Sequence, residues 1–189
     1  MYKEGKIYVI GIGPGGKENM TYEAIQIFND VECVVGYKSY IELIREMIAD
    51  KEVISSGMKK EIERCELCFD IAEQGKKVAI VSSGDAGIYG MAGLIYEVAK
   101  RRDSKIEIEV VCGVTSSTAA ASILGAPLMH DYATISLSDL LTDWDLIKKR
   151  VDLASQGDFV ITLYNPKSHG RTTQIVEARE IMRKYKSDE

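Results

Sequence analysis

The sequence predicts an α/β protein with a largely parallel sheet. Short apolar runs of strand length alternate along the 189 residues with amphipathic stretches of helical length. The run at 77–82 is continuously apolar in its centre, which is typical of a strand buried on both faces of such a sheet. Several of the runs end in glycine-rich loops, where small residues allow the backbone to be approached closely.

Strands are expected first at 7–10, 31–35, 53–54 and 77–82. The first helix begins after Thr21, a good N-cap, and runs to about Asn29 with its apolar residues on one face. Helical spacing of isoleucines predicts a second helix over 40–48. A long polar-faced helix follows over 60–74, and Gly75 ends it.

In the second half, a glycine-rich loop at 83–90 leads into a helix that ends at about Lys100. The strand at 106–111 alternates Ile with Glu, so one of its faces is expected to be wet. The remaining elements are helices at 117–124, 145–155 and 173–185 and strands at 133–137 and 159–164. The character of the chain changes near Gly125, which predicts domains over 1–113 and 114–189.

Charge and hydropathy exclude several classes of protein. The chain has 29 acidic and 24 basic residues, a net charge of −5, whereas a general nucleic-acid binder needs a basic footprint. Apolar runs of 18 residues and a signal peptide are both missing from the sequence. We therefore expect a cytoplasmic protein that binds neither nucleic acid nor membrane.

The four cysteines predict no disulfide and no metal site. Cys33 and Cys112 lie in apolar strand contexts, which is typical of buried thiols in a reducing compartment. Cys65 and Cys68 form a single C-x-x-C in a helical segment, with no second pair and no histidine at zinc spacing. Neither structural zinc nor a redox centre is predicted.

Residues 11–16 match the pattern G-x-G-x-x-G of dinucleotide-binding proteins. In those proteins the third glycine already lies in the helix, but here the helix begins at Thr21, five residues after Gly16. Pro14 also removes a backbone N–H from the loop. The pattern alone is therefore weak evidence, and a nicotinamide-dependent oxidoreductase is kept as the less favoured alternative.

Three more loops follow predicted strands in the same way, at 82–90, 112–117 and 164–168. Ligands of open α/β sheets bind beyond the carboxyl ends of the strands, and small residues let the backbone approach them closely. Together the loops predict a nucleoside-like ligand held largely by main-chain groups.

Five segments, taken in order, resemble the tetrapyrrole methylases: GIGPGG at 11–16, SSGDAGIYGMAG at 82–93, CGVTSSTAAASILGAPL at 112–128, SLSDLLTDW at 136–144 and LYNPKS at 163–168. The resemblance implies two α/β/α domains with a cofactor cleft between them. It also implies S-adenosyl-L-methionine as cofactor, a tetrapyrrole as substrate and a homodimer as the assembly.

Three segments resemble the precorrin-3B C17-methyltransferase branch of that family: VVGYKSYI at 34–41, GMKKEIERC at 57–65 and LYNP at 163–166. This resemblance implies methylation of C17 of precorrin-3B or cobalt-precorrin-3, with ring contraction, in cobalamin biosynthesis. Two alternatives are a methylase of the same fold that acts on another precorrin or on a non-tetrapyrrole acceptor, and a non-catalytic remnant.

The resemblance also implies a set of cofactor-binding residues: Gly13, Pro14, Gly15, Ser83, Gly84, Asp85, Ile88, Thr115, Ser116 and, from the second domain, Tyr164. Asp85 is placed to bind a ribose hydroxyl or to face the cationic cofactor. Its alternative role is to stabilise its own loop through an Asx turn.

Methyl transfer from a sulfonium depends mainly on positioning and electrostatics, whereas ring contraction also needs proton transfers. Asp85 and His130 are the candidate catalytic residues. Asp85 lies in the glycine-rich loop at 83–90, and His130 lies just after the domain boundary. His169 follows the loop at 164–168. For each histidine the alternative is a solvated loop side chain.

A substrate with many carboxylates needs local positive charge despite the acidic total. The cations that follow predicted strand ends are Lys38, Lys59, Lys60, Lys167 and Arg171. For each of them the alternative interpretation is a loop side chain whose charge is solvated and binds no ligand.

Members of the family continue for several elements after the LYNP-like loop, whereas one helix follows it here. The resemblance therefore implies that the second domain is truncated at its C-terminus. We expect an exposed apolar sheet edge, weak stability of that domain, or a partner that covers it.

Overall fold

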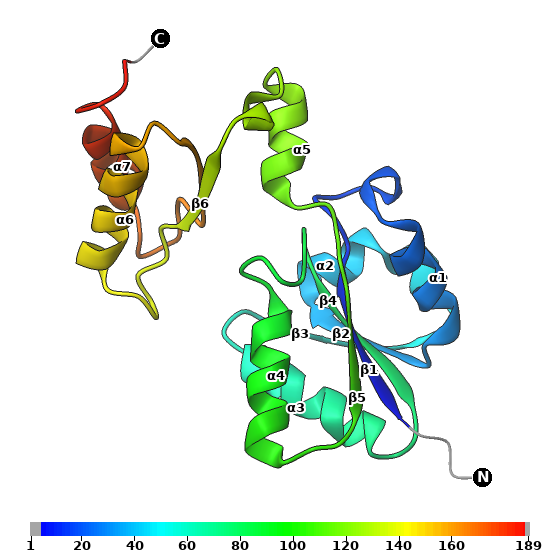
Figure 1. Ribbon diagram of the computed structural model, residues 1–189. Coiled ribbons are helices and arrows are strands. Elements are labelled where there is room, and N and C mark those ends of the chain that lie inside the picture. Colours follow the sequence, from blue (N-terminus) through cyan, green and yellow to red (C-terminus); the bar gives the residue numbers. More distant parts are fainter. Residues whose placement is uncertain (1–4, 188–189) are drawn as a thin grey trace. The chain divides into compact units, whose positions relative to one another are not determined.

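The structure of the chain, a computed structural model, describes residues 5–187 (Figure 1). It divides into two compact units, residues 1–119 and 120–189. The division falls a few residues after the boundary expected at 113, and the terminal residues 1–4 and 188–189 of the two expected domains lie outside the described part. Each unit is described by itself.

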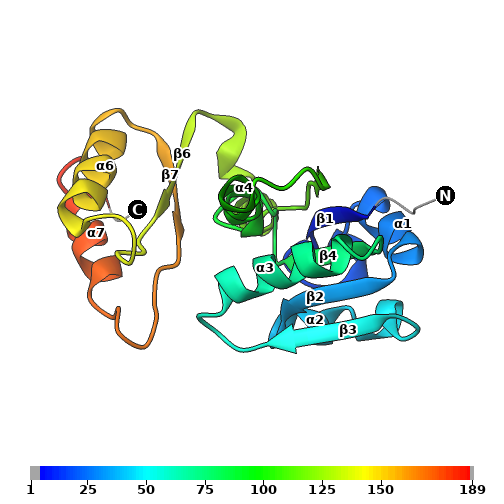
Figure 2. The same cartoon turned by 90° about the horizontal axis from the view of Figure 1, so that it is seen from below.

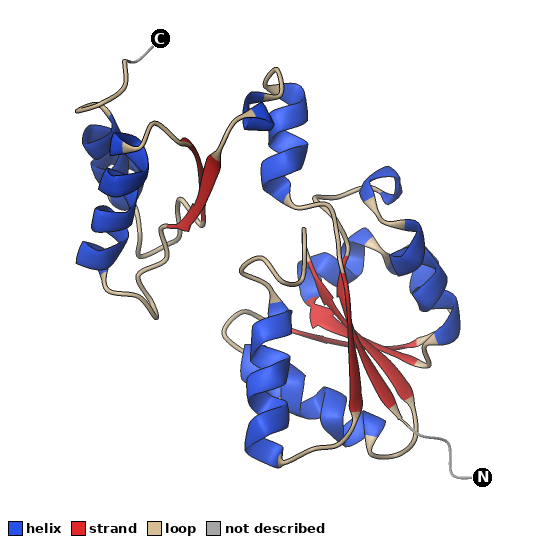
Figure 3. Ribbon diagram, viewed as in Figure 1, coloured by secondary structure: helices blue, strands red, loops and turns tan. Residues whose placement is uncertain are grey.

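The first unit is built on a five-stranded parallel sheet with strand order β3-β2-β4-β1-β5. Figure 3 shows the strands in red, with helices in blue. The strands are β1 (Lys6–Gly11), β2 (Cys33–Tyr37), β3 (Glu52–Ser56), β4 (Lys77–Ser82) and β5 (Glu107–Val111). Strand β1 pairs with β4 and β5 on either side, with Ile7 opposite both Val78 and Ile108. The continuous apolar run of β4 is buried on both faces, as the sequence predicts.

Helices cover both faces of this sheet (Figure 1). They are α1 (Tyr22–Asp30), α2 (Lys38–Leu43), α3 (Glu61–Ala72) and α4 (Met91–Arg102). Helix α5 (Ser116–Ile123) follows β5, and the division between the two units falls inside it. Two 3₁₀ turns, Lys17–Asn19 and Arg45–Ile48, add to them. The helix expected over 40–48 is therefore wrong in part, because the chain breaks into α2 and a separate 3₁₀ turn.

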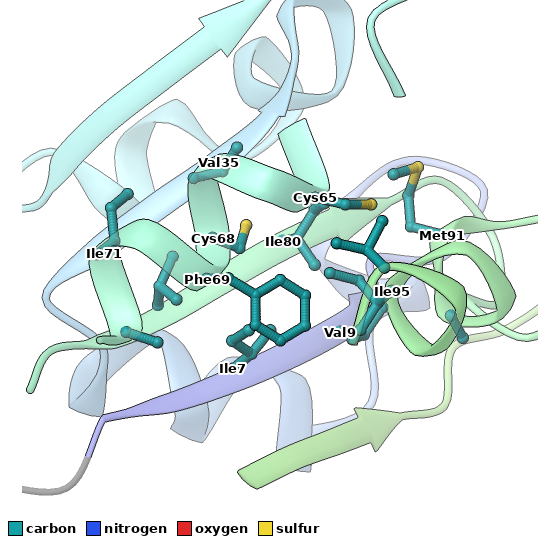
Figure 4. Close-up of a cluster of buried hydrophobic side chains, with 14 of the residues drawn as sticks. Ile7, Val9, Val35, Cys65, Cys68, Phe69, Ile71, Ile80, Met91 and Ile95 are labelled. Atoms are coloured by element: carbon teal, nitrogen blue, oxygen red, sulfur yellow. The ribbon is translucent and has the colours of Figure 1, made fainter. Parts of the chain in front are cut away.

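Alternate residues of each strand point to opposite faces, so the sheet carries two apolar cores. On one face, Ile7 of β1 packs with Phe69 of α3 and Ile95 of α4 (Figure 4). On the other face, Ile10 of β1 packs with Phe28 of α1. Each large apolar side chain buried in this way contributes about 1.5–3 kcal/mol, so both cores hold the strand ends in place.

Strand β5 is an edge strand and its outer face is wet, as its Ile-Glu alternation predicts. Glu107 and Glu109 form ion pairs with Lys6 of β1 at 2.5 and 2.7 Å. Burial along the strand is confined to its last residue, Val111. The expectation that Cys112 is a buried thiol is wrong, because it lies just beyond that residue and is exposed.

The second unit contains a βαβ arrangement followed by a helix. Strands β6 (Tyr132–Ser136) and β7 (Val160–Tyr164) are parallel, and α6 (Trp144–Gln156) connects them. A short 3₁₀ turn, Pro127–Met129, precedes β6, and α7 (Gln174–Met182) follows β7. The buried core here is small and consists of Ile135, Leu137, Ile147, Val151 and Ala178. Figure 2 shows both helices of this unit on the same face of the two strands.

None of the helices within residues 5–187 combines the length and the apolar character that a membrane crossing requires.

Candidate functional site

Three loops meet at the carboxyl ends of neighbouring strands in the first unit. They follow β1, β4 and β5, which lie side by side in the sheet. The loops after β1 and β4 are joined by a reciprocal pair of hydrogen bonds. Gly13 N donates to Gly84 O at 3.1 Å, and Gly84 N donates to Gly13 O at 2.8 Å. Both glycines have a positive φ, +73° and +65°, which side chains disfavour.

Gly11 and Gly113 let the backbones of the three loops approach one another closely. A Cβ atom on Gly113 would lie 2.2 Å from the carbonyl oxygen of Gly84, and one on Gly11 would lie 2.6 Å from that same oxygen. Both distances are far below van der Waals contact, and the obstructing atom belongs to the backbone. These two glycines are therefore required for packing of the loops against each other, whatever ligand the loops hold.

Asp85 ties the second loop to the third. Its Oδ1 accepts a hydrogen bond from Gly87 N at 2.8 Å, and its Oδ2 accepts one from Gly113 N at 2.9 Å. The first of these contacts is the Asx turn that the sequence offered as the alternative role of Asp85. The second reaches across to the loop after β5, which local sequence does not reveal. The carboxylate therefore fixes the loops after β4 and β5 relative to each other, and it uses both of its oxygens to do so.

The first loop is supported from the side of α1. Thr21 is the N-cap of that helix, as predicted, since its Oγ1 accepts from Ala24 N at 3.2 Å. The same hydroxyl donates to Cys112 O at 3.3 Å. Residues 17–19 form a 3₁₀ turn, so Gly16 is separated from the helix that begins at Tyr22. This geometry departs from that of a dinucleotide fingerprint, in which the third glycine lies in the helix.

The other residues predicted in the first unit leave ligand-accessible surface around these glycines. Pro14, Ser83 and Ser116 are exposed, and Ile88 is 37% exposed, whereas Thr115 is half-buried. A Cβ atom on Gly15 would meet nothing within 4 Å, and one on Gly84 would find its nearest neighbour at 3.8 Å. The cluster therefore combines tightly packed backbone on one side with open backbone on the other, which suits a small molecule bound by main-chain groups.

Tyr164 and His130 belong to the second unit. Tyr164 ends β7, and its carbonyl accepts a hydrogen bond from Leu137 N at 2.9 Å. His130 is exposed at the end of the 3₁₀ turn before β6, and His169 is exposed in the loop after β7. The structure thus gathers the predicted residues of the first unit into one cluster, whereas Tyr164, His130 and His169 lie in the second unit.

A buried arginine, Arg171, fixes the loop after β7, a structural role that the sequence does not reveal. Arg171 is 7% exposed, its Nε donates to Asn165 O at 3.1 Å, and its Nη1 lies 3.4 Å from Oδ1 of Asp139. The pKa of Asp139 is lowered, mainly by a hydrogen bond with the backbone of Asp139 itself. Hydrogen bonds from Gln174 and Arg171 lower it further. Asn165 adopts a φ of +50° and donates to Ser136 Oγ at 3.0 Å. Arg171 is therefore a structural cation.

The structure separates the five predicted cations into two groups. Lys60 pairs with Glu63 at 2.8 Å, and Arg171 pairs with Asp139. Lys38, Lys59 and Lys167 are exposed, and no acidic partner lies within ion-pair distance of them in the described chain. Only the second group has charge available for an anionic ligand.

Within residues 5–187, no three of the His, Cys, Asp and Glu side chains are grouped so that they could hold a metal ion. Cys65 and Cys68 lie inside the apolar cluster between α3 and the sheet (Figure 4). Cys33 belongs to the same cluster. Burial raises the pKa of Cys33 to about 11 and that of Cys65 to about 12, and it raises the pKa of Cys68 as well. These thiols stay protonated at neutral pH and serve as apolar core atoms.

The fold and the loop cluster place the chain in the class of α/β proteins whose ligand site lies at the carboxyl edge of a parallel sheet. A sequence profile of the Tetrapyrrole (Corrin/Porphyrin) Methylases matches residues 6–189. The chain therefore belongs to the tetrapyrrole methylase family.

Among its relatives, the probable cobalt-factor III C(17)-methyltransferase of Salmonella typhimurium is 51% identical over 179 residues, which are 95% of this chain and 74% of that protein. The cobalt-factor III methyltransferase of Priestia megaterium is 49% identical over 188 residues, which are 97% of this chain and 35% of that protein. The chain thus spans about a third of the length of this second relative.

A solved structure, that of the methyltransferase CobJ, superposes with a TM-score of 0.89 at 33% sequence identity. The match covers 97% of this chain and 77% of that one. The α/β fold with a parallel sheet is therefore that of the tetrapyrrole methylases, as the resemblance implied.

Proposed function

We propose that this chain binds S-adenosyl-L-methionine at the loops after β1, β4 and β5 and methylates C17 of a precorrin-3-type tetrapyrrole, with ring contraction, in cobalamin biosynthesis. The observation that carries the proposal is the coincidence of two findings. The backbone cluster of Gly13, Gly84, Asp85 and Gly113 is open on one side, and relatives about half identical to the chain are named C17-methyltransferases or cobalt-factor III methyltransferases.

Both relatives carry cobalt-factor III in their names. This favours a cobalt-containing macrocycle over its metal-free counterpart as the substrate. In this case the cobalt enters the site as part of the substrate.

S-adenosyl-L-methionine supplies a methyl group on a positively charged sulfur, which is ready for in-line displacement by an electron-rich carbon of the substrate. The chain contributes position. The open backbone around Gly15 and Gly84 contacts the cofactor, with Pro14, Ser83, Ile88, Thr115 and Ser116 beside it. Asp85 holds two of the loops in register, and we assign Tyr164 to the adenine side. Such positioning supplies a large part of the rate of a displacement reaction.

We assign proton transfer during ring contraction to His130, which is exposed at the end of the 3₁₀ turn before β6. A His130→Ala variant should keep its affinity for the cofactor and form the methylated product, but contract the ring more slowly. His169→Ala serves as the control for loss of an exposed loop histidine. Equal contraction by both variants would remove His130 from this role.

The cofactor proposal is tested by titrating the purified chain with S-adenosylhomocysteine in a calorimeter, with NADH in a parallel titration. We expect saturable binding of the homocysteine product and none of NADH. The reverse result would favour the nicotinamide alternative.

The substrate proposal is tested by incubating the chain with S-adenosyl-L-methionine and either cobalt-factor III or its metal-free analogue. Mass spectrometry should detect the addition of one methyl group to the cobalt form. Binding of S-adenosylhomocysteine without methylation of either macrocycle would support a different acceptor or a non-catalytic chain.

A further inference from the structure

The carboxyl ends of β2 and β3 lie at the same edge of the sheet as the cofactor loops, but the proposed cofactor site does not use them. The two strands are parallel neighbours (Figure 2). Tyr37 at the end of β2 pairs with Ser56 at the end of β3. Lys38 follows the first of these ends, and Lys59 follows the second. We propose that Lys38 and Lys59 form a binding site for the carboxylate arms of the tetrapyrrole substrate, an inference that rests on the proposed function.

The loop that carries Lys59 is held in one conformation by a buried cation. Arg64 of α3 is 6% exposed, and its Nη1 donates to Ser56 Oγ and to Gly57 O, both at 2.9 Å. Its Nη2 donates to Glu61 Oε1 at 3.2 Å, which neutralises the buried charge. The guanidinium therefore fixes the path of the chain from the end of β3 to the start of α3, and a fixed loop loses less entropy when it binds a ligand.

The backbone of Lys59 is itself unusual. Its φ of +63° lies in the left-handed region, which a side chain disfavours and which persists only where the surroundings impose it. A glycine would adopt this conformation at no steric cost, yet the position carries a long cationic side chain that is exposed. The backbone conformation of the loop therefore favours glycine at this position, whereas the chain has an exposed lysine there.

The charge balance around the two strand ends leaves these lysines available. The nearby acids are already paired: Glu42 with Arg45, Glu61 with Arg64, and Glu63 with Lys60. Lys38 adds only a minor coulombic contribution to the lowered pKa of Glu42, whose main partner is Arg45. Within the described part of the chain, Lys38 and Lys59 have no ion-pair partner. The surface beyond the carboxyl ends of β2 and β3 is therefore positively charged, although the chain as a whole is acidic.

The spacing of the sheet suits a large substrate. Strand β3 lies two positions from β4 in the sheet. Because neighbouring strands are about 4.8 Å apart, the loop after β3, which carries Lys59, starts roughly 10 Å from the cofactor loop after β4. A tetrapyrrole macrocycle with acetate and propionate arms is broad enough to bridge such a distance. One end of it can then reach the methyl donor beside β4 while its carboxylates contact the lysines beyond β2 and β3.

The test compares Lys38→Ala, Lys59→Ala and the double variant with a control, Lys100→Ala. Lys100 is exposed and has no ion-pair partner among the described residues. It lies in the last turn of α4, which leads to the amino end of β5 and therefore away from the carboxyl ends of the strands. The purified chain is titrated with uroporphyrin III, a polycarboxylate tetrapyrrole, at low and at high salt. S-adenosylhomocysteine is titrated into the same proteins.

We expect each single substitution to weaken uroporphyrin binding about three- to fivefold and the double substitution to weaken it roughly tenfold. The salt dependence of binding should decrease in the same order. Lys100→Ala should bind like the wild type, and S-adenosylhomocysteine affinity should stay within about twofold throughout.

Absence of uroporphyrin binding by the wild-type chain, or equal losses in the lysine variants and in Lys100→Ala, would overturn the inference. A wild-type chain that binds uroporphyrin through the two lysines but does not bind S-adenosylhomocysteine would contradict the proposed function and leave the carboxylate site standing.

Discussion

At the scale of single residues, the carboxylate of Asp85 links two loops of the proposed cofactor site through hydrogen bonds from Gly87 N and Gly113 N. Replacing it with alanine leaves both donors without this acceptor. We expect Asp85→Ala to lower the free energy of unfolding by about 1–3 kcal/mol and to weaken S-adenosylhomocysteine binding tenfold or more. Denaturant titration and calorimetry measure the two effects.

Asp85→Asn is the informative companion, because an amide keeps one acceptor oxygen and should fall between the wild type and Asp85→Ala. Glu97→Ala, at an exposed position of α4, controls for loss of an acidic side chain and should change neither quantity. If Asp85→Ala binds the ligand as tightly as the wild type does, the carboxylate has no positioning role.

The cysteines provide a second prediction at this scale. Cys112 is exposed, whereas Cys33, Cys65 and Cys68 are fully buried with a raised pKa. A chromogenic aromatic disulfide at pH 8 should therefore react rapidly with one thiol of the native chain and with all four after denaturation. Cys112→Ala should abolish the rapid phase. More than one rapid thiol in the native wild type would contradict the burial of Cys33, Cys65 and Cys68.

The same thiols make stability depend on pH in the alkaline range. Their folded-state pKa lies above the value of about 9 for an accessible thiol, so the folded chain holds its protons more tightly than the unfolded chain does. The stability that they contribute is complete below pH 9 and is lost as the pH rises through the folded-state pKa values, about 11 for Cys33 and about 12 for Cys65. Denaturation midpoints measured across this range should decrease, and replacing Cys33 with alanine should flatten the decrease.

At the scale of elements, the glycines of the chain fall into two kinds that substitution separates. A Cβ atom on Gly113 would lie 2.2 Å from a backbone oxygen, whereas one on Gly93, inside α4, would meet nothing within 4 Å. Gly113→Ala should lower the free energy of unfolding by about 1–3 kcal/mol and displace the loops. Gly93→Ala should raise it by about 0.5–1 kcal/mol, because alanine favours the helix. Chemical denaturation of the two variants gives the sign of each change, and a stable Gly113→Ala would contradict the close approach.

The elements also show where the sequence was sufficient. Continuous apolar residues predict β4 over 77–82 as it is found, and the N-cap at Thr21 predicts the start of α1, because both signals are local. The split of the 40–48 helix was missed, because isoleucine spacing alone does not distinguish an α-helix from a 3₁₀ turn. Cys112 was misplaced for a similar reason, since burial along β5 ends at Val111.

For the candidate site, the glycine-rich loops were visible in the sequence, but their mutual contacts were not. The pairing of Gly13 with Gly84 and the contact of Asp85 with Gly113 join segments that are far apart along the chain. The same holds for Arg171 and Asp139, whose pairing turns a predicted ligand-binding cation into a structural one. Local patterns do not determine such partners, because only the fold brings them together.

At the scale of the whole molecule, the two units differ in the size of their cores. The sheet of the first unit is packed on both faces, whereas the core cluster of the second unit consists of five buried apolar residues beside two strands. Amide hydrogens of β6 and β7 should therefore exchange with solvent faster than those of β1 and β4, since opening of the second unit exposes less apolar surface. Hydrogen exchange followed by mass spectrometry checks this, and equal protection of the two sheets would contradict it.

The strand order of the first unit also has a consequence for synthesis on the ribosome. Strand β1 is made first, but its only partners in the sheet are β4 and β5, so it stays unpaired until the chain has been extended beyond Lys77. At about 5–20 residues per second this delay lasts several seconds, during which the apolar segment Ile7–Ile10 lacks its neighbours. Strands β2 and β3 can pair with each other in the meantime. The nascent chain therefore assembles the β2–β3 side of its sheet, which carries Lys38 and Lys59, before β1 can join β4.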